Sequence, residues 1–340
     1  MGIKMIFPKW LEKGDGIGVV APSAGVTKPL DIVRFENAKE QLAAEGYPVT
    51  IAEHVFCDDG KGRSSDGVTR GKDLNGLFAD NSIRAIISAK GGDFLVEMLP
   101  HCDFKVLIKN PKWVQGYSDN TSLLYYITTK LDIATVYGFH FGDFGMKLWH
   151  EAVSNGLHLL EGKNPQQNSF SYYEDGFYDR ETGLEGFHED KPVCWVNGRG
   201  EEKISVSGRL IGGCLDVLGF ICGTKYDGTL EFIEKYKEDG ILWYLESFHA
   251  FSEELIMKLW QLKELGWFAH ASGFLFGRPC MYESFSGTSY QSAVMSILGD
   301  LNVPVIFDMD IGHKGPQFSM INGAKAEVVS ENGKGSLKYI

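Results

Sequence analysis

Residues 113–127, WVQGYSDNTSLLYYI, place an apolar run directly before Gly116 and Ser118 and then begin a helical pattern. A serine at the corner between a buried strand and a helix has two interpretations. Ser, Asp and Asn are the usual N-caps of helices, so Ser118 can be only a cap. A serine on a sharp turn from strand to helix is also how some hydrolases expose a nucleophile. The rest of the sequence must decide between a helix cap and a nucleophile.

The first 150 residues alternate between short apolar runs and helical patterns. The runs lie at 17–25, 47–53, 85–92 and 113–117, and the helical patterns at 33–46, 70–80 and 94–100. This alternation predicts a parallel sheet with right-handed crossover helices. Ligands of such sheets bind at the carboxyl ends of the strands. Polar or glycine-rich turns follow three of the predicted strands, at 22–25, 90–93 and 117–119.

At 340 residues the chain is long for a single core, and its rhythm stops in the middle. Residues 161–203 are rich in Gly, Asp, Glu and aromatics without a period, which is typical of an interdomain connection. Strand and helix patterns then resume at 205–224, 241–247, 252–268, 273–279 and 303–313, the third with a Ser-x-x-Glu-like start. We therefore predict a two-lobed α/β protein. An N-terminal parallel-sheet domain over residues 1–160 carries the elbow, residues 161–203 form a linker and substrate loop, and residues 204–340 form a mixed β/α domain.

The composition of the chain limits the classes of partner that we expect it to bind. The chain has 33 basic and 45 acidic residues and a net charge of −12, which repels nucleic acid and anionic lipid surfaces. No apolar segment approaches the roughly 18 to 20 residues of a membrane span, and no secretory leader opens the chain. The six cysteines are scattered, which indicates reduced thiols, and no metal-binding pattern occurs. We expect a cytoplasmic protein without nucleic-acid or membrane partners, metal or cofactor.

A serine nucleophile needs a base, and the base needs an orienting carboxylate. Of nine histidines, His313 has the most distinctive context, because FDMDIGHKG places it just past an apolar run and between glycines. Glu246 ends the apolar run ILWYLE, where a buried carboxylate is costly without a partner. An imidazole would be such a partner; a salt bridge or a helix cap near Ser252 is the alternative. Ser118, Glu246 and His313 follow the chain order of α/β-hydrolases, although Asn120 replaces the second glycine of G-x-S-x-G.

Gly91 and Gly92 match no phosphate-loop pattern. We expect an oxyanion hole instead, made of the N–H groups of Gly92 and of Asp119, the residue after the nucleophile. A carboxypeptidase also needs a group that holds a terminal carboxylate. Arg209 and Lys90 are available, and nothing in the sequence selects between them.

Six segments, taken in order and spacing, resemble the serine LD-carboxypeptidase (muramoyltetrapeptide carboxypeptidase) family and in particular its microcin C immunity branch. They are GDGIGVVAPSAG, GGDFLVEMLP, GYSDNTSLL, GRLIGGCLDVLGFICGT, ILWYLES and PVIFDMDIGH. The resemblance implies a cofactor-free, cytoplasmic, homodimeric hydrolase, with Ser118 on the N-terminal domain and Glu246 and His313 on the C-terminal one. Its substrate would be an LD-peptide of murein or a peptidyl- or aminoacyl-nucleotide antibiotic of the microcin C kind.

The chain departs from the family at the expected substrate contacts. Cys214 stands where the family has the asparagine of Gly-Gly-Asn-Leu, and Phe177 or Tyr178 stands nearest to the tryptophan that stacks on a nucleobase in the immunity branch. With Gly91, these are the substrate-binding candidates. A competing hypothesis is a non-catalytic two-lobed protein that binds a small ligand, with Ser118 as a cap. A third is a nucleotide-dependent enzyme that uses Gly91 and Gly92.

Overall fold

The computed structural model describes residues 4–163 and 165–340. Contacts divide the chain into two compact units. The N-terminal unit takes Met1–Asn164 and Tyr178–Phe187, and the C-terminal unit takes Pro165–Phe177 and His188–Ile340. The chain therefore changes unit three times within the middle stretch, and each unit is described by itself below.

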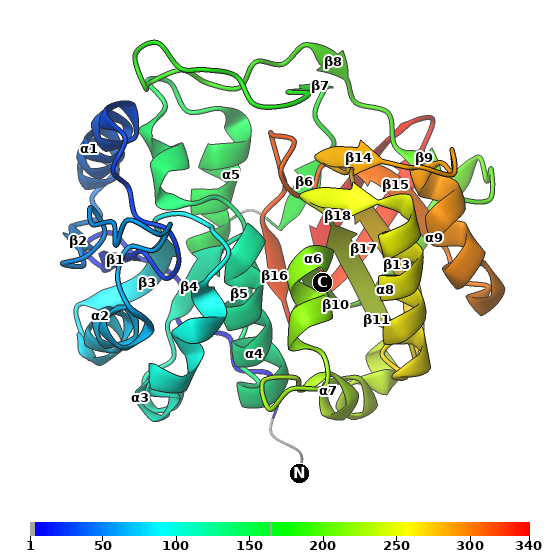
Figure 1. The fold of residues 1–340 in the computed structure, drawn as a ribbon, viewed down its shortest axis with the longest axis horizontal. Helices are drawn as coiled ribbons and strands as arrows, with labels where there is room; N and C mark the ends of the chain where they lie inside the picture. The colour runs from blue at the N-terminus through cyan, green and yellow to red at the C-terminus, as the bar shows by residue number, and fades with distance from the viewer. Residues whose placement is uncertain (1–3, 164) are drawn as a thin grey trace. The chain divides into compact units, whose positions relative to one another are not determined.

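The N-terminal unit contains a parallel sheet whose strands follow the order β5-β4-β3-β1-β2 (Figure 1). The predicted parallel α/β architecture is confirmed. Its elements are β1 (Gly16–Val20), α1 (Pro29–Ala44), β2 (Val49–Ile51), α2 (Gly67–Ala79), β3 (Ile83–Ser88), η1 (Leu95–Glu97), η2 (Leu99–His101), α3 (Phe104–Lys109), β4 (Trp113–Gly116), η3 (Ser118–Asn120), α4 (Thr121–Leu131), β5 (Thr135–Tyr137), η4 (Phe141–Gly145) and α5 (Glu151–Leu160).

Local sequence explains where these helices begin and end. Pro29 starts α1, where the missing N–H of a proline costs nothing. The helix ends before Gly46, whose φ of +91° suits glycine. The side chain of Asp66 caps α2 by accepting a hydrogen bond from the N–H of Thr69 at 2.8 Å.

The helix predicted over residues 94–100 is present only as two short 3₁₀ helices, η1 and η2. Pro100 lies in the first turn of η2, lacks an N–H and restricts the residue before it, which disfavours one continuous α-helix through Pro100.

The C-terminal unit contains a mixed sheet in the order β6-β18-β17-β10-β11-β13-β15-β9. Strands β10, β11, β13 and β15 run parallel, and the outer strands pair antiparallel, as predicted for this lobe. Its elements are β6 (Gln166–Asn168), β7 (Tyr172–Tyr173), β8 (Lys191–Pro192), β9 (Val196–Asn197), β10 (Lys203–Cys214), α6 (Leu215–Ile221), α7 (Thr229–Lys235), η5 (Lys237–Asp239), β11 (Ile241–Glu246), β12 (His249–Phe251), α8 (Ser252–Glu264), β13 (Ala271–Gly277), β14 (Met281–Glu283), α9 (Tyr290–Leu298), η6 (Gly299–Leu301), β15 (Val305–Met309), β16 (Met320–Asn322), β17 (Lys325–Glu331) and β18 (Lys334–Tyr339).

Helix α8 lies where its amphipathic pattern predicts, but its predicted cap is wrong. Phe251 occupies the N-cap position, and no side-chain hydrogen bond closes it. The hydroxyl of Ser252 hydrogen-bonds to that of Ser284 at 2.8 Å instead. The Ser252 side chain therefore links the start of α8 to the segment at Ser284 instead of capping the helix.

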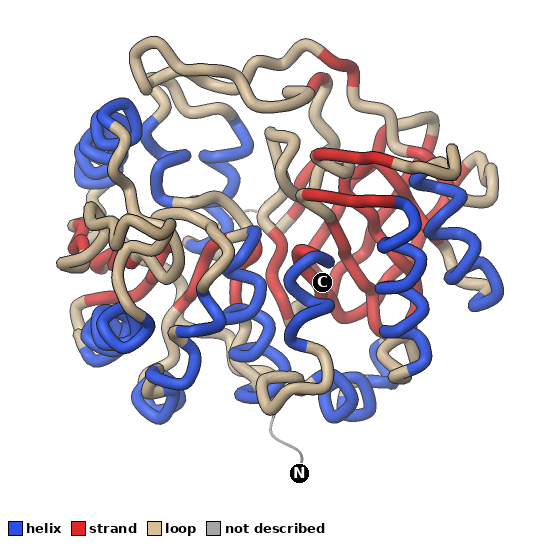
Figure 2. The backbone as a smooth tube through the Cα atoms, viewed as in Figure 1, coloured by secondary structure: helices blue, strands red, loops and turns tan. Residues whose placement is uncertain are grey.

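The middle of the chain is mostly loop, with short strands at β6 to β9 (Figure 2). β7 pairs with β8, and β6 and β9 are the outermost strands of the mixed sheet. Among the described residues, no helix is long and apolar enough to cross a lipid bilayer.

Candidate active site

Ser118 sits on a sharp turn between β4 and the helix that follows. Its φ is +62°, in the left-handed region that residues other than glycine rarely adopt, and the preceding Tyr117 is extended. The N-caps of η3 and α4 are Tyr117 and Asn120, and neither cap is closed by a side chain. The capping interpretation of Ser118 therefore fails. Strain of this kind at a polar residue is typical of functional sites.

Asn120 explains how the elbow forms without the second glycine. Its buried amide donates to the carbonyl oxygen of Tyr117 at 2.9 Å, and its oxygen accepts from the hydroxyl of Ser88 at 2.5 Å. Gly116 makes room for it, because a Cβ on Gly116 would lie 2.9 Å from Cγ of Asn120. The glycine that matters for packing here is thus the first one.

His140 is a member of this cluster that the sequence did not single out. Its ring stacks on Tyr117 with centroids 4.0 Å apart. The amide of Asn120 lies 3.1 Å from its Nε2, and the backbone N–H of Tyr117 lies 3.3 Å from the same atom. No local pattern marks His140, since its partners are about 20 residues away in the chain.

The Gly-Gly turn after β3 lies against the elbow. A Cβ on Gly91 would lie 3.1 Å from Cβ and 3.3 Å from Oγ of Ser118, so a side chain there would have to shift the serine by a few tenths of an ångström. Gly92 has φ +149° and packs against Ser23. The carboxylate of Asp119 accepts from the N–H of Leu95 at 3.0 Å, and burial raises the pKa of that carboxyl. The N-terminal unit therefore brings Gly91, Ser118 and Asp119 together.

The C-terminal unit pairs Glu246 with His313, 67 residues apart. Glu246 ends β11 and is fully buried, and its Oε2 lies 2.8 Å from Nδ1 of His313. Two glycines shape the space around the carboxylate. A Cβ on Gly312, which has φ +97°, would lie 2.5 Å from Oε2, and a Cβ on Gly277 would lie 3.0 Å from Cβ of Glu246. Gly312 excludes a side chain through this contact and its φ, and Gly277 excludes one because its Cβ would lie 2.1 Å from the carbonyl oxygen of Ile311.

Aromatic side chains cover this pair. The ring of Phe248 lies 4.9 Å from that of His313, and Phe177 packs on Phe248 at 6.0 Å. Phe177 is 63% exposed, so much of its surface is open to a ligand. Tyr178, the other aromatic predicted for stacking, belongs to the N-terminal unit. Phe248 was missed because a Phe two residues past a strand carries no distinctive pattern.

Cys214 ends β10 beside Glu246 in the strand register. Burial, with Glu246 and Asp216 nearby, raises the pKa of its thiol well above the ordinary value. The thiol is therefore neutral, and its Sγ lies 3.7 Å from the carboxylate of Asp216. It is a much weaker hydrogen-bonding group than the asparagine of the family pattern.

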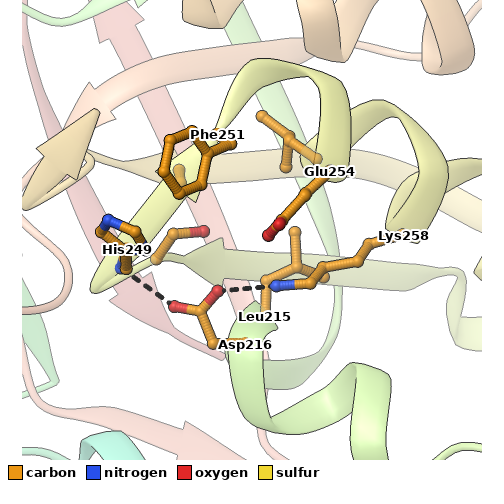
Figure 3. Close-up of a pocket in the computed structure, with 9 residues that line it drawn as sticks. Leu215, Asp216, His249, Phe251, Glu254 and Lys258 are labelled. Atoms are coloured by element: carbon orange, nitrogen blue, oxygen red, sulfur yellow. Dashed lines mark hydrogen bonds and ion pairs between the residues drawn. The ribbon is translucent and has the colours of Figure 1, made fainter. Parts of the chain in front are cut away.

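Asp216 fixes the loop that follows Glu246. Its carboxylate accepts from the N–H of Phe248 at 2.9 Å. It also accepts from the N–H of His249 at 3.2 Å and pairs with Nζ of Lys258 at 2.9 Å (Figure 3). These contacts hold the backbone that carries both Glu246 and Phe248. The signal for Asp216 in the sequence was an acid in the first turn of a helix directly after a strand.

The two candidates for holding a carboxylate are engaged elsewhere. Arg209 hydrogen-bonds to Asp239 at 2.6 and 2.9 Å, and it lies at the start of the β10–β11 pairing, whereas Cys214 and Glu246 lie at its end. Lys90 pairs with Asp31 at 3.2 Å. Within residues 4–163 and 165–340, no group of three or more His, Cys, Asp or Glu side chains is arranged to hold a metal ion.

Three curated relatives align with nearly the whole chain. A putative carboxypeptidase of Vibrio cholerae is 28% identical and covers 96% of each chain. A probable murein peptide carboxypeptidase of Bacillus subtilis is 27% identical over 94% of this chain and 90% of its own. The microcin C7 self-immunity protein of Escherichia coli is 26% identical over 95% of this chain and 92% of its own.

Solved structures agree with the fold. A MccF-like protein of Bacillus anthracis is 25% identical, with a TM-score of 0.79 over 98% of this chain and 99% of its own. A MccF-like protein of Streptococcus pneumoniae in complex with AMP is 25% identical, with a TM-score of 0.77 over 96% and 98%.

Family models match both halves of the chain. The LD-carboxypeptidase N-terminal domain matches residues 17–138, and the C-terminal domain of the same family matches residues 207–328. The N-terminal match contains the elbow, and the C-terminal match contains the paired acid and imidazole. The chain therefore belongs to the LD-carboxypeptidase family of serine peptidases, which includes carboxypeptidases of murein peptides and microcin immunity proteins.

Proposed function

We propose that Ser118, His313 and Glu246 form the catalytic triad of a serine-type carboxypeptidase or amidase. The observation that carries this proposal is the 2.8 Å hydrogen bond between Nδ1 of His313 and the fully buried carboxylate of Glu246. A carboxylate in that position fixes the tautomer and orientation of the imidazole and stabilises its protonated form. The strained Ser118 on its elbow supplies the nucleophile.

The chemistry follows from which ring nitrogen of His313 is hydrogen-bonded to Glu246. Glu246 holds Nδ1 of His313, so Nε2 accepts the proton of the Ser118 hydroxyl as Oγ attacks the amide carbonyl. The tetrahedral intermediate collapses when Nε2 returns that proton to the leaving nitrogen, which departs as an amine. Nε2 of His313 then deprotonates a water molecule, which attacks the acyl group and releases it from Ser118. The mechanism requires hydrogen-bond contact between Oγ and Nε2 during turnover.

The oxyanion hole in this proposal consists of the N–H groups of Gly92 and Asp119. The close approach of Gly91 to Ser118 supports it, because this brings the Gly-Gly backbone to the nucleophile. Backbone donors fixed beforehand stabilise the developing negative charge without reorganisation. The anchoring of Leu95 by the Asp119 side chain would hold the same turn in place.

For the substrate we propose an LD-peptide of the murein kind or a peptidyl- or aminoacyl-nucleotide of the microcin C kind. The named activities of the relatives support both classes. Phe177, with Phe248 behind it, offers an exposed aromatic surface beside His313, and Gly91, Cys214 and Tyr178 complete the proposed substrate contacts. Residues 161–203 would act as the substrate loop between domains 1–160 and 204–340. The homodimer and the cytoplasmic location stay predictions.

A fluorophosphonate probe tests the nucleophile directly. We expect covalent labelling at Ser118 in the parent protein, none at that position in Ser118→Ala, and unchanged labelling in the control Ser154→Ala, which alters a helix α5 serine of the same unit. Amide cleavage should fall several orders of magnitude in Ser118→Ala. Turnover by Ser118→Ala at the parental rate would refute the mechanism, and a folded parent protein that neither labels nor cleaves would favour the small-ligand binder.

A further inference from the structure

A pocket of about 520 Å³ opens in the C-terminal unit, and its wall includes Lys314, the residue that follows His313 in the chain. Its lining residues are Tyr173, Arg278, Pro279, Cys280, Tyr282, Ser289, Tyr290, Gln291, Asp308 and Lys314. Nothing in the triad chemistry uses these side chains.

The pocket shares its backbone with the acid–imidazole pair. Gly277 packs against Cβ of Glu246, and the next residue, Arg278, enters the pocket wall. The N–H of Cys280 donates to the carbonyl oxygen of Ser247, the residue after Glu246, at 3.0 Å. The wall and the catalytic carboxylate are therefore held by the same short segments.

Two cations line the pocket and are held in place. Nζ of Lys314 pairs with Asp175 at 2.6 Å, which leaves two of the three ammonium N–H donors for further hydrogen bonds. Arg278 donates to Asp310 and to the carbonyl oxygen of Asp308, each at 2.8 Å, and stacks on the ring of Tyr173 at 4.3 Å. Cations fixed in this way bind an anion at a small cost in side-chain entropy.

The wall also contains donors without acceptors. Arg278 and Tyr290 are each 4% exposed, and within the described part of the chain neither Nε of Arg278 nor the hydroxyl of Tyr290 has a hydrogen-bond partner. Burial, with Asp308 and Glu246 nearby, raises the pKa of Tyr290 well above its ordinary value, so the hydroxyl keeps its proton. Unpaired buried donors are unfavourable, and an acceptor bound in the pocket with a small adjustment of these side chains would relieve that cost.

We propose that this pocket binds the anionic group of the leaving fragment, with Lys314 as its principal cation. The inference rests on the proposed function, in which His313 protonates the leaving nitrogen and the leaving fragment must therefore lie beside His313. In a peptide the terminal carboxylate is only two bonds from that nitrogen; in an aminoacyl-nucleotide the corresponding anion is a phosphate. The four candidate cations, Arg209, Lys90, Arg278 and Lys314, are all paired with carboxylates. What distinguishes Lys314 is its place in a pocket wall directly after His313.

Asp308 is the acidic side chain in the wall, and it opposes an anionic ligand. Its Oδ2 accepts from the amide of Gln291 at 3.2 Å, and it lies in the fields of Arg278 and Lys314. Replacing it by asparagine, which tolerates its φ of +58°, keeps the backbone and removes the charge. Under the proposal, Asp308→Asn tightens the binding of an anionic ligand or leaves it unchanged.

Calorimetric binding to the Ser118→Ala variant tests the pocket without requiring turnover. The probes are an LD-tetrapeptide ending in D-alanine, the same peptide as its C-terminal carboxamide, and AMP. We expect the acid to bind about 10- to 100-fold more tightly than the carboxamide, and Lys314→Met to remove this difference. Lys325→Met, which removes a lysine paired with Asp239 elsewhere in the same unit, should preserve it.

The outcomes separate the two anion sources and the two proposals. Loss of AMP binding in Lys314→Met, with no preference between the acid and the carboxamide, would support the pocket and assign the anion to a nucleotide. The proposal would be overturned if the acid and the carboxamide bound equally and Lys314→Met left AMP binding unchanged. A preference for the acid that survives in Lys314→Met would also overturn it. So would weaker binding of the acid to Asp308→Asn, or no binding of any probe. The triad proposal is judged separately, by fluorophosphonate labelling of the parent protein.

Discussion

At the residue scale, the site depends on a carboxylate that is completely removed from water. Burying Glu246 alone would be strongly unfavourable, and its hydrogen bond with His313 offsets that cost only while the geometry is kept. Gly312 is the residue that permits the geometry, since its positive φ and missing Cβ let the backbone pass over the carboxylate. A residue with no reactive group thus controls the position of two that have one.

Gly312→Ala should lower kcat about 100-fold or more, because its Cβ would displace the Glu246 carboxylate and with it the imidazole. The matched control is Gly287→Ala. Gly287 has a similar φ of +75°, but a Cβ there meets nothing within 4 Å. Gly287→Ala therefore measures the effect of an alanine at positive φ without a clash like that between the Gly312 Cβ and Glu246. Steady-state kinetics on an amide substrate, with circular dichroism to verify folding, measures the effect. Equal kinetic losses in the two variants would show that strain alone is responsible.

The sequence led to Glu246 and His313 through local anomalies, namely a carboxylate at the end of an apolar run and a histidine between glycines. The structure places them in contact, and their catalytic role stays a prediction. Phe248 and His140 could not be found in this way, and the acid in the first turn of a helix that marks Asp216 does not reveal its partners. Each owes its place to contacts between segments about 20 to 65 residues apart, as between Phe248 and His313, and such contacts leave no local pattern.

At the scale of elements, the elbow from β4 to α4 shows how one turn can be built from different residues. In the usual motif two glycines flank the serine. Here Asn120 fills the second position and ties the turn to Ser88 on β3 and to the carbonyl oxygen of Tyr117. The hydrogen bonds of the Asn120 side chain therefore hold a turn that the usual motif builds with a second, conformationally free glycine.

Asn120→Ala should destabilise the N-terminal unit by about 2 to 4 kcal/mol, since it removes the acceptor of the buried Ser88 hydroxyl and one of the donors to the Tyr117 carbonyl oxygen. Asn81→Ala is the control. Asn81 is exposed and accepts one hydrogen bond from Asn110, so its loss should cost less than about 1 kcal/mol. Urea denaturation followed by tryptophan fluorescence measures both. A small effect for Asn120→Ala would mean that the turn is stable without these bonds.

The elements that could be predicted are those whose periodicity is a property of neighbouring residues. Several short strands, and the C-terminal strands β17 and β18, were not predicted. At residues 94–100 the predicted helix is divided into two short 3₁₀ helices, the second of which contains Pro100. At Ser252 the start of the helix only approximates a capping box, since Leu255 stands where the glutamate belongs, and the serine side chain bonds to Ser284, 32 residues away. Competition from a distant partner is what the sequence could not reveal.

At the scale of the whole molecule, the path of the chain between its units is the notable feature. Residues 178–187 return to the N-terminal unit, while the segments on either side belong to the C-terminal unit. Arg34 on α1 holds this return. Its buried guanidinium donates to the carbonyl oxygens of Gly183 and Glu185 at 2.9 and 2.8 Å and to that of Gly142 at 2.8 Å. Two backbone carbonyls of the segment that begins one residue after Phe177 are thus bound by one side chain, and a third, that of Leu184, accepts from the N–H of Lys147 at 2.8 Å.

Arg34→Met should release residues 178–187, because methionine can fill part of the volume but donates no hydrogen bond. Arg180 lies in this segment, is 39% exposed and pairs with Asp31, so trypsin reports on its mobility. We expect cleavage after Arg180 to become at least about tenfold faster, since proteolysis follows the population of the opened segment. Lys39→Met, an exposed change on the same helix, should leave the rate unchanged. Mass spectrometry of the early fragments identifies the cut. An unchanged rate after Arg180 in a folded Arg34→Met protein would mean that other contacts hold the return, and the substrate loop would then not depend on this arginine for its position.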